Sequence, residues 1–245
     1  MIKSKVKKLL PQSTRLKGKL AIRYWKDLFD GNHAKFASTS NNTTGYKEVF
    51  KVEQPILDSN VLKSKENKVH NIAHGASAVE QVEIAPGEIF SFWKALGRPS
   101  KRNGYKEGIN IIEGKIKEDY GGGLCQLASL VYHTGLQAGL EMIERYNHSV
   151  DLYKNETRYT PLGSDAAVFY GYKDLRMKNT LPYPIRFKFK VENDLIVCSF
   201  LSTDDIKPQE IIFETVIEEK DYEEVLTKKV IGDKKETIAV SSYKL

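Results

Sequence analysis

The pattern of apolar residues predicts an α+β protein built around one buried helix. Residues 124–138 carry apolar side chains at helical spacing on more than one face, and no charged residue occurs between Asp119 and Glu141. A helix that is apolar on most sides is buried on most sides, and Gly139 is a natural end for it. We therefore expect this helix to pack in the core against an antiparallel sheet.

The remaining pattern supplies the elements around that helix. Helical spacing predicts a helix over residues 13–30, with Ser13 as its N-cap, and a second helix over residues 71–79. Apolar runs and alternation predict strands at 89–93, 109–116, 140–152, 165–172, 174–179, 185–191, 195–201, 211–217 and 230–243. The pair 185–191 and 195–201 has the spacing of a hairpin.

The chain divides at a polar segment. Residues 37–46 read as a linker or exposed loop, and a continuous folded pattern begins at Val69. We therefore predict a basic helical appendage over residues 1–46 and one main domain over residues 47–245. A chain of 245 residues can bury a sizeable core.

Charge adds one feature to this picture. The formal net charge is +6, and residues 1–26 contain nine basic residues and no acidic one. These are Lys3, Lys5, Lys7, Lys8, Arg15, Lys17, Lys19, Arg23 and Lys26. Such an arm can contact anionic lipid or nucleic acid. A solvated basic tail is the favoured interpretation, peripheral contact with an anionic membrane is the alternative, and nucleic acid is not favoured as a partner.

Location and cofactors are constrained by what the sequence lacks. Pro11 and Arg23 interrupt the short apolar stretches near the N-terminus, and no run is long enough for a signal peptide or a membrane span. Two cysteines, Cys125 and Cys198, are too few for a disulfide scaffold and suit a reducing compartment. We expect a cytoplasmic protein, with membrane-peripheral contact as the alternative, and no cofactor.

Candidate chemistry lies where three glycines run into the central helix. Cys125 follows Gly121, Gly122 and Gly123 at the predicted helix start. Glycine permits close backbone approach and positive φ, and a helix N-terminus favours a thiolate. Cys125 is therefore a candidate nucleophile, with a small buried core residue as the alternative. The three glycines lack the Gly-Lys-Ser/Thr ending of a phosphate loop, but they could form a turn that binds an anion.

A nucleophilic thiol needs a base and a group that orients the base. His133 is unsuitable, because eight residues along a helix rise about 12 Å. His148 lies on the predicted core-facing side of the 140–152 strand, so it is the candidate base, with a core histidine as the alternative. His70 and His74 share a helix face, but they lack further ligands with metal-site spacing, so no metal site is predicted.

The orienting acid remains open between several aspartates. Asp165 is preferred, Asp174 is a second candidate, and Asp151 falls on the strand face opposite His148. Gln126 and the backbone N–H groups of residues 125 and 126 could stabilise an oxyanion. Cys198 lies within a predicted hairpin strand and is expected to be a core residue.

Six ordered segments carry a resemblance to a known family. They are 86–93 (PGEIFSFW), 104–108 (GYKEG), 121–126 (GGGLCQ), 144–149 (ERYNHS), 161–166 (PLGSDA) and 171–179 (GYKDLRMKN). In this order they resemble motifs of the VanW family and cover roughly residues 69–190; the tail beyond about residue 200 matches no such motif. The resemblance implies a link to glycopeptide resistance and cell-wall metabolism, and no defined reaction. The order of helix cysteine, histidine and aspartate is also similar to transglutaminase-like or papain-like cores, by analogy of order alone.

Two functions are therefore expected. The first is a cysteine-dependent hydrolase or acyltransferase acting on an amide or peptide of a wall precursor, with Cys125, His148 and Asp165 or Asp174 in the site. The second is a non-catalytic accessory that binds a peptidoglycan precursor or a membrane-associated partner through the glycine turn.

Overall fold

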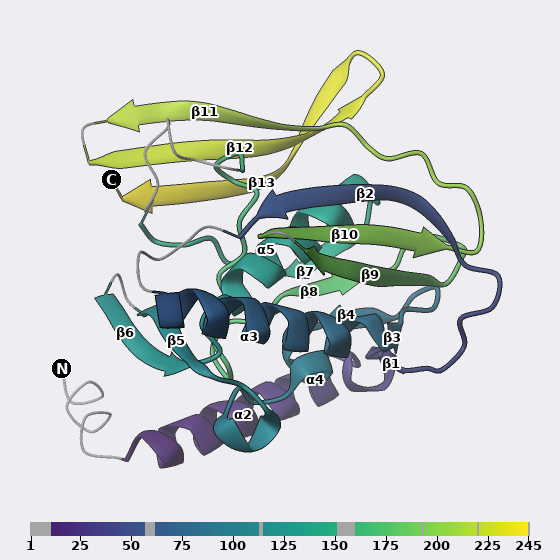
Figure 1. Ribbon diagram of the computed structural model, residues 1–245. Coiled ribbons are helices and arrows are strands. Elements are labelled where there is room, and N and C mark those ends of the chain that lie inside the picture. The colour runs from purple at the N-terminus through teal and green to yellow at the C-terminus, as the bar shows by residue number, and fades with distance from the viewer. Residues whose placement is uncertain are drawn as a thin grey trace.

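The computed structural model describes residues 11–56, 62–112, 115–150, 160–192, 194–219 and 221–244. Within these ranges the chain is α+β, as predicted, and every pair of neighbouring strands in its sheets is antiparallel. Figure 1 shows the C-terminal sheet at one end of the molecule and the N-terminal helix at the opposite end.

The central helix α5 (Leu124–Gln137) is buried, as its composition predicts. Leu127, Leu130 and Val131 have no exposed surface. The helix ends where expected, because Gly139 takes a φ of +77° and the Leu140 N–H returns to the carbonyl of Gly135 at 3.0 Å. This hydrogen bond satisfies a carbonyl that the last helical turn leaves free.

Helix α5 packs against helix α3 (Leu62–Glu80) and against a three-stranded sheet, which α3 also contacts. That sheet has the order β2 (Lys47–Pro55), β10 (Leu195–Ser202), β9 (Ile185–Glu192). The predicted β9–β10 hairpin is confirmed. Strand β2 was not predicted, and α3 begins well before residue 71. The folded body therefore starts earlier than the pattern from Val69 indicated.

A second sheet has the order β4 (Ile89–Ser91), β8 (Arg176–Lys178), β7 (Glu141–Glu144). A hairpin of β5 (Glu107–Ile112) and β6 (Lys115–Tyr120) leads into the glycines before α5. Short elements complete this part of the chain. They are η1 (His33–Lys35), β1 (Ser38–Thr39), β3 (Val82–Glu83), α4 (Phe92–Leu96) and η2 (Lys101–Asn103).

The C-terminal sheet consists of β11 (Ile211–Glu219), β12 (Tyr222–Ile231) and β13 (Lys234–Lys244). The single strand predicted over residues 230–243 is wrong, because the chain turns at Gly232, which has a φ of +58°. The residues before this turn close β12 and those after it form β13. This sheet lies above the β2–β10–β9 sheet in Figure 1.

Two strand predictions around the candidate site are also wrong. The strand predicted over 140–152 stops at Glu144, where the pairing of β7 with β8 is irregular between Met142 and Glu144. The segment predicted as a strand from Asp165 to Tyr172 forms no ladder apart from an isolated bridge between Phe169 and Lys173. His148 and Asp165 therefore both lie on loops, which leaves their backbone groups free to bond neighbouring segments.

Helix α2 (Gln12–Phe29) confirms the predicted N-terminal helix, although Pro11 rather than Ser13 precedes its first turn. It is joined to the body by ion pairs of Arg23 with Glu144 and of Asp27 with Arg176. The division of the chain at residue 46 stays a prediction. Among the helices of the described ranges, none combines the length and the hydropathy needed to cross a bilayer.

Candidate active site

The glycine turn brings the β5–β6 hairpin against the start of α5. Gly123 precedes the helix with a φ of +98°, a conformation that favours glycine. A Cβ atom on Gly122 would lie 2.8 Å from the backbone of Gly108, and the Gly121 N–H donates to the Lys106 carbonyl at 3.1 Å. Glycine is thus required here for close packing between two backbones. The predicted binding of a ligand by these glycines stays a prediction.

Cys125 lies in the first turn of α5 and is partly buried. Its Sγ atom is 3.6 Å from the Val168 carbonyl oxygen, and its thiol lies close enough to His148 for the imidazole to lower the pKa of the thiol. His133 lies further along the same helix, where Phe213 packs against its ring. The histidine that meets the thiol therefore comes from a segment outside the helix.

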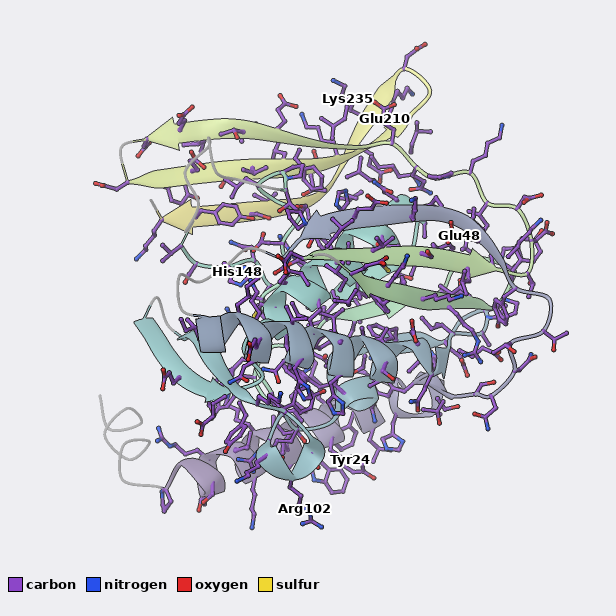
Figure 2. The ribbon with its side chains drawn as sticks, in the orientation of Figure 1. Tyr24, Glu48, Arg102, His148, Glu210 and Lys235 are labelled. Atoms are coloured by element: carbon purple, nitrogen blue, oxygen red, sulfur yellow. The ribbon has the colours of Figure 1, made fainter. Side chains whose placement is uncertain are left out.

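His148 and Asp165 are in direct contact. His148 Nδ1 lies 2.6 Å from Asp165 Oδ2, and the same oxygen accepts the His148 backbone N–H at 2.7 Å. Because Nδ1 faces the carboxylate, Nε2 is the ring nitrogen left for Cys125. Figure 2 shows His148 on the left at mid-height, below the C-terminal sheet and above α3.

The second carboxylate oxygen of Asp165 has two donors of its own. Arg145 Nη2 donates to Oδ1 at 2.9 Å, and the Tyr243 hydroxyl donates to the same oxygen. Arg145 also binds the carbonyls of Gly163 and Asp165 and the hydroxyl of Ser241. The orientation of this carboxylate is thus fixed from both sides.

These contacts determine the charge states of the three groups. Burial by itself would raise the pKa of the Cys125 thiol, but the hydrogen bond and charge of His148 outweigh it and lower the pKa. Burial would lower the pKa of His148, but hydrogen bonds to Asp165 and Cys125 raise it. Burial would raise the pKa of Asp165, which His148 and Arg145 hold below its usual range. All three net shifts favour a thiolate beside an imidazolium.

Short links join the three segments that carry these side chains. The Ser129 hydroxyl donates to the Cys125 carbonyl at 2.8 Å and accepts the Ala166 N–H at 2.9 Å. The Ala167 N–H donates to the carbonyl of Tyr146 at 2.7 Å. The Ser129–Ala166 and Ala167–Tyr146 hydrogen bonds each join two of the segments, so they hold the helix start and both loops in one arrangement.

Strand β13 also contacts the loop that carries His148. The Asn147 amide donates to the Ser242 carbonyl at 2.7 Å, and the Lys244 N–H donates to the Ser149 carbonyl at 3.0 Å. With Ser241 on Arg145 and Tyr243 on Asp165, successive residues of one strand contact this loop and the carboxylate. The C-terminal sheet is therefore part of the site's framework.

Asp174, the second candidate for the orienting acid, lies in a different network. Its carboxylate accepts from the Ser91 hydroxyl at 2.6 Å and from Arg176 Nε at 2.9 Å. Burial raises its pKa even though these donors oppose the shift. The structure thus places Asp165, and not Asp174, against His148. Asp151, the third candidate, lies outside the described residues.

The predicted oxyanion donors are only partly free. The Gln126 side-chain amide donates to the Pro55 carbonyl at 2.7 Å, and the Gln126 backbone N–H donates to the Gly123 carbonyl at 3.0 Å. Gln126 therefore ties α5 to β2. Among the described backbone carbonyls, none accepts the N–H of Cys125, which leaves this N–H as the remaining donor of the predicted set.

The other cysteine and histidines have different environments. Cys198 is fully buried in β10, and burial raises its pKa to about 12. The rings of His70 and His74 stack, but each Nε2 lies 2.8 Å from a backbone carbonyl oxygen, of Gly104 and Asn103 respectively. Within the part of the chain that the structure describes, no three His, Cys, Asp or Glu side chains are grouped as metal ligands.

Fold and site together define an α+β protein with a Cys–His–Asp cluster at the start of its buried helix. A family model described as "VanW like protein" matches residues 67–201. Because this match covers more than half of the chain, the protein belongs to the VanW-like family, as the motifs indicated.

Two curated relatives match parts of the chain. The uncharacterized protein YoaR of Bacillus subtilis is 32% identical over 143 residues, which are 58% of this chain and 46% of that protein. The vancomycin B-type resistance protein VanW of Enterococcus faecalis is 34% identical over 115 residues, which are 47% of this chain and 42% of that protein. The chain thus spans less than half the length of either relative. No solved structure matches with significance, so a transglutaminase-like or papain-like core is not confirmed.

Sequence reasoning missed three residues that contact the cluster or join its segments: Arg145, Ser129 and Tyr243. The sequence could have indicated Arg145, because it belongs to the same family-like segment, 144–149, as His148. Ser129 looked like any small residue on a buried helix. Tyr243 gave no signal, because it lies outside the segments that resemble the family and outside the matched region.

Proposed function

We propose that this protein is a cysteine-dependent enzyme that cleaves or transfers an acyl group at an amide bond. The observation that carries the proposal is the 2.6 Å contact between His148 Nδ1 and Asp165 Oδ2, with the other ring nitrogen left for Cys125. A nucleophile, a base and a group that orients the base are the parts required for such catalysis.

The first half of the reaction forms an acyl-enzyme. The Cys125 thiolate attacks the amide carbonyl carbon, a C–S bond forms, and the carbonyl π electrons move to oxygen. In this proposal the N–H of Cys125 donates to that oxyanion. When the tetrahedral intermediate collapses, the C–N bond breaks, and His148 gives its Nε2 proton to the leaving amine. The product is a thioester on Cys125 and a neutral imidazole.

The second half restores the resting state. His148 takes a proton from water, or from an acceptor amine, as that group attacks the thioester carbonyl. The C–S bond then breaks and Cys125 leaves as a thiolate beside the imidazolium. Throughout both halves Asp165 stays ionised and keeps Nδ1 protonated, which fixes the tautomer that presents Nε2 to the reacting atoms.

The substrate class rests on the family. The name of the Enterococcus faecalis relative associates that protein with vancomycin resistance, and vancomycin is a glycopeptide that acts on the cell wall. We therefore propose an amide or peptide of a wall precursor as the substrate. The accessory-binding alternative is less well supported, because the glycine turn is occupied by packing against Gly108 and Lys106.

The test is to trap the acyl-enzyme. The full chain is incubated with a mixture of soluble peptidoglycan-precursor peptides, quenched in acid and analysed by mass spectrometry. We expect an adduct on Cys125 that hydroxylamine releases, together with shortened or transferred peptides. Cys125→Ala removes both signals. Cys198→Ala is the matched control and retains them, because Cys198 is fully buried in β10 and burial keeps its thiol protonated.

One result would favour the binding alternative instead. If the peptides remain intact and bind wild-type protein and Cys125→Ala with equal affinity, the protein is an accessory module and the catalytic proposal fails.

A further inference from the structure

One face of helix α2 packs against the body of the protein. Leu16 and Leu20 lie against Gly171, Arg23 pairs with Glu144 at 2.7 Å, and Asp27 pairs with Arg176 at 2.6 Å. These four residues follow the spacing i, i+4, i+7 and i+11, which is a single stripe along a helix. The buried side of the helix therefore does not include Ile22, Trp25 or Phe29.

The opposite face carries large apolar side chains in solvent. Ile22 is 66% exposed, Trp25 54% and Phe29 82%. At about 100° per residue these three lie within about 60° of one another and point away from the docked stripe. The rings of Trp25 and Phe29 stack with centroids 6.1 Å apart, so they form one continuous surface. Leu28 and Tyr24 extend it at the edge, 45% and 49% exposed.

Cations flank this apolar face on both sides. Arg15, Lys19 and Lys26 lie along one edge of the helix and Lys17 along the other, all exposed. The sole acidic residue of α2 is Asp27, which faces inward and is paired with Arg176. The sequence before the helix adds four lysines at positions 3, 5, 7 and 8. An exposed apolar stripe bordered by cations is typical of a helix that lies in a membrane interface.

We propose that α2 docks this protein on the surface of an anionic lipid bilayer. The exposed face inserts Ile22, Trp25 and Phe29 among the acyl chains, while the flanking lysines and arginine contact anionic headgroups. Charge selects this occupant over a second copy of the chain, because two such faces would place like charges opposite each other.

The position of α2 in the molecule suits this role. Figure 1 shows the helix along one edge, at the opposite end from the β11–β12–β13 sheet. Figure 2 shows Tyr24 and Arg102 at that same end. A planar surface can therefore meet α2 while the C-terminal sheet stays clear of it. This proposal does not depend on the reaction at Cys125.

Vesicle binding tests the proposal with the full chain. Co-sedimentation is compared between vesicles of phosphatidylcholine alone and vesicles that contain phosphatidylglycerol as well. We expect binding to the anionic vesicles, a loss of binding as salt rises, and a blue shift of the Trp25 emission. The shift is obtained by subtracting the spectrum of Trp25→Phe, which keeps an apolar ring but lacks the reporter.

A double variant and a matched control distinguish binding through this face of α2 from non-specific binding by exposed apolar residues. Trp25→Ser with Phe29→Ser should weaken binding at least about tenfold, because two large apolar side chains no longer leave water. Val216→Ser with Ile231→Ser removes two exposed apolar residues, 44% and 50% exposed, from the C-terminal sheet and should leave binding unchanged. Urea unfolding checks that both variants remain folded.

Two results would overturn the proposal. One is equal binding, or none, to neutral and anionic vesicles. The other is a concentration-dependent dimer that the Trp25→Ser, Phe29→Ser variant dissolves, which would assign the face to a second copy.

Discussion

Two polar networks meet at adjacent residues of the chain and differ in what they can do. The Asp165 network consists of Cys125, Arg145, His148, Asp165 and Tyr243. The Asp174 network consists of Arg23, Asp27, Glu144, Asp174 and Arg176. Glu144 and Arg145 follow one another at the end of β7, where successive side chains point to opposite sides, so one short segment supplies both.

The two aspartates show the difference most clearly. Both accept hydrogen bonds from an arginine and a hydroxyl group. Asp165 also faces a histidine, and its pKa is lowered, whereas burial raises the pKa of Asp174. The side chain of Asp165 is 20% exposed and that of Asp174 is 4% exposed. A titratable partner and access to solvent are what distinguish a network suited to chemistry from one that joins two elements.

The largest expected effect comes from replacing each of the two aspartates by asparagine and measuring the rate in the acyl-transfer assay. Asp165→Asn removes the charge that holds the Nδ1–H tautomer of His148, so we expect the rate to fall about 10²- to 10⁴-fold. Asp174→Asn is the matched control, and the rate of its folded fraction should stay within about twofold of wild type. The rates are measured from peptide cleavage by mass spectrometry. Equal losses in both variants would mean that the networks are not separate.

The second expected effect is on stability. Arg176→Met leaves Asp27 and Asp174 buried without their shared cation, which should cost about 3–5 kcal/mol of unfolding free energy. Urea unfolding measures the cost. Lys178→Met, on the neighbouring exposed ion pair with Glu141, is the control and should cost no more than about 1 kcal/mol. A loss below about 1 kcal/mol for Arg176→Met would show that this network does not hold α2 to the body.

Part of the fold and of the site could be predicted from the sequence. The buried α5, its end at Gly139 and the β9–β10 hairpin were predictable, because each depends on local composition and spacing. The choice between Asp165 and Asp174 was not, because both follow glycine-containing segments and only the tertiary fold brings one of them to His148.

The errors have a common physical origin. Residues 145–149 and 165–168 alternate like strands, yet their backbone groups bond to side chains and to other loops. The Ala166 N–H meets Ser129, for example, and the His148 N–H meets Asp165. Strand β2 and Tyr243 were missed because their roles depend on pairing with segments more than 75 residues away.

The third expected effect concerns the charge state of Cys125. Thiolate rises with pH through the pKa of the thiol, so a lowered pKa should place the midpoint of iodoacetamide labelling below about 8.5, the value of a free thiol. In His148→Ala the favourable partner is gone and burial remains, so the midpoint should move above that value. Cys198 is the internal control, because burial keeps it protonated and covered. A midpoint at or above about 8.5 in the wild-type protein would identify Cys125 as an inert thiol.

The smallest expected effect comes from Tyr243, which reaches Asp165 from a strand outside the region matched by the family model. Tyr243→Phe removes one donor from Asp165 Oδ1, but Arg145 still donates to the same oxygen. The rate in the peptide assay should therefore fall about tenfold, the lower end of the range for one hydrogen bond to a charged group. Tyr222→Phe, whose hydroxyl bonds Glu224 at the start of β12, is the control and should leave the rate unchanged.

The pH profile of the rate separates positioning by Tyr243 from simple support of the sheet. Loss of the donor leaves the negative charge of Asp165 less compensated and so makes Asp165 a stronger partner for the imidazolium. The alkaline limb of the profile should therefore move to higher pH as the pKa of His148 rises. If Tyr243→Phe lowers stability without moving that limb, the C-terminal sheet supports the loops but does not tune the carboxylate, and the Asp165 network is complete within the family region.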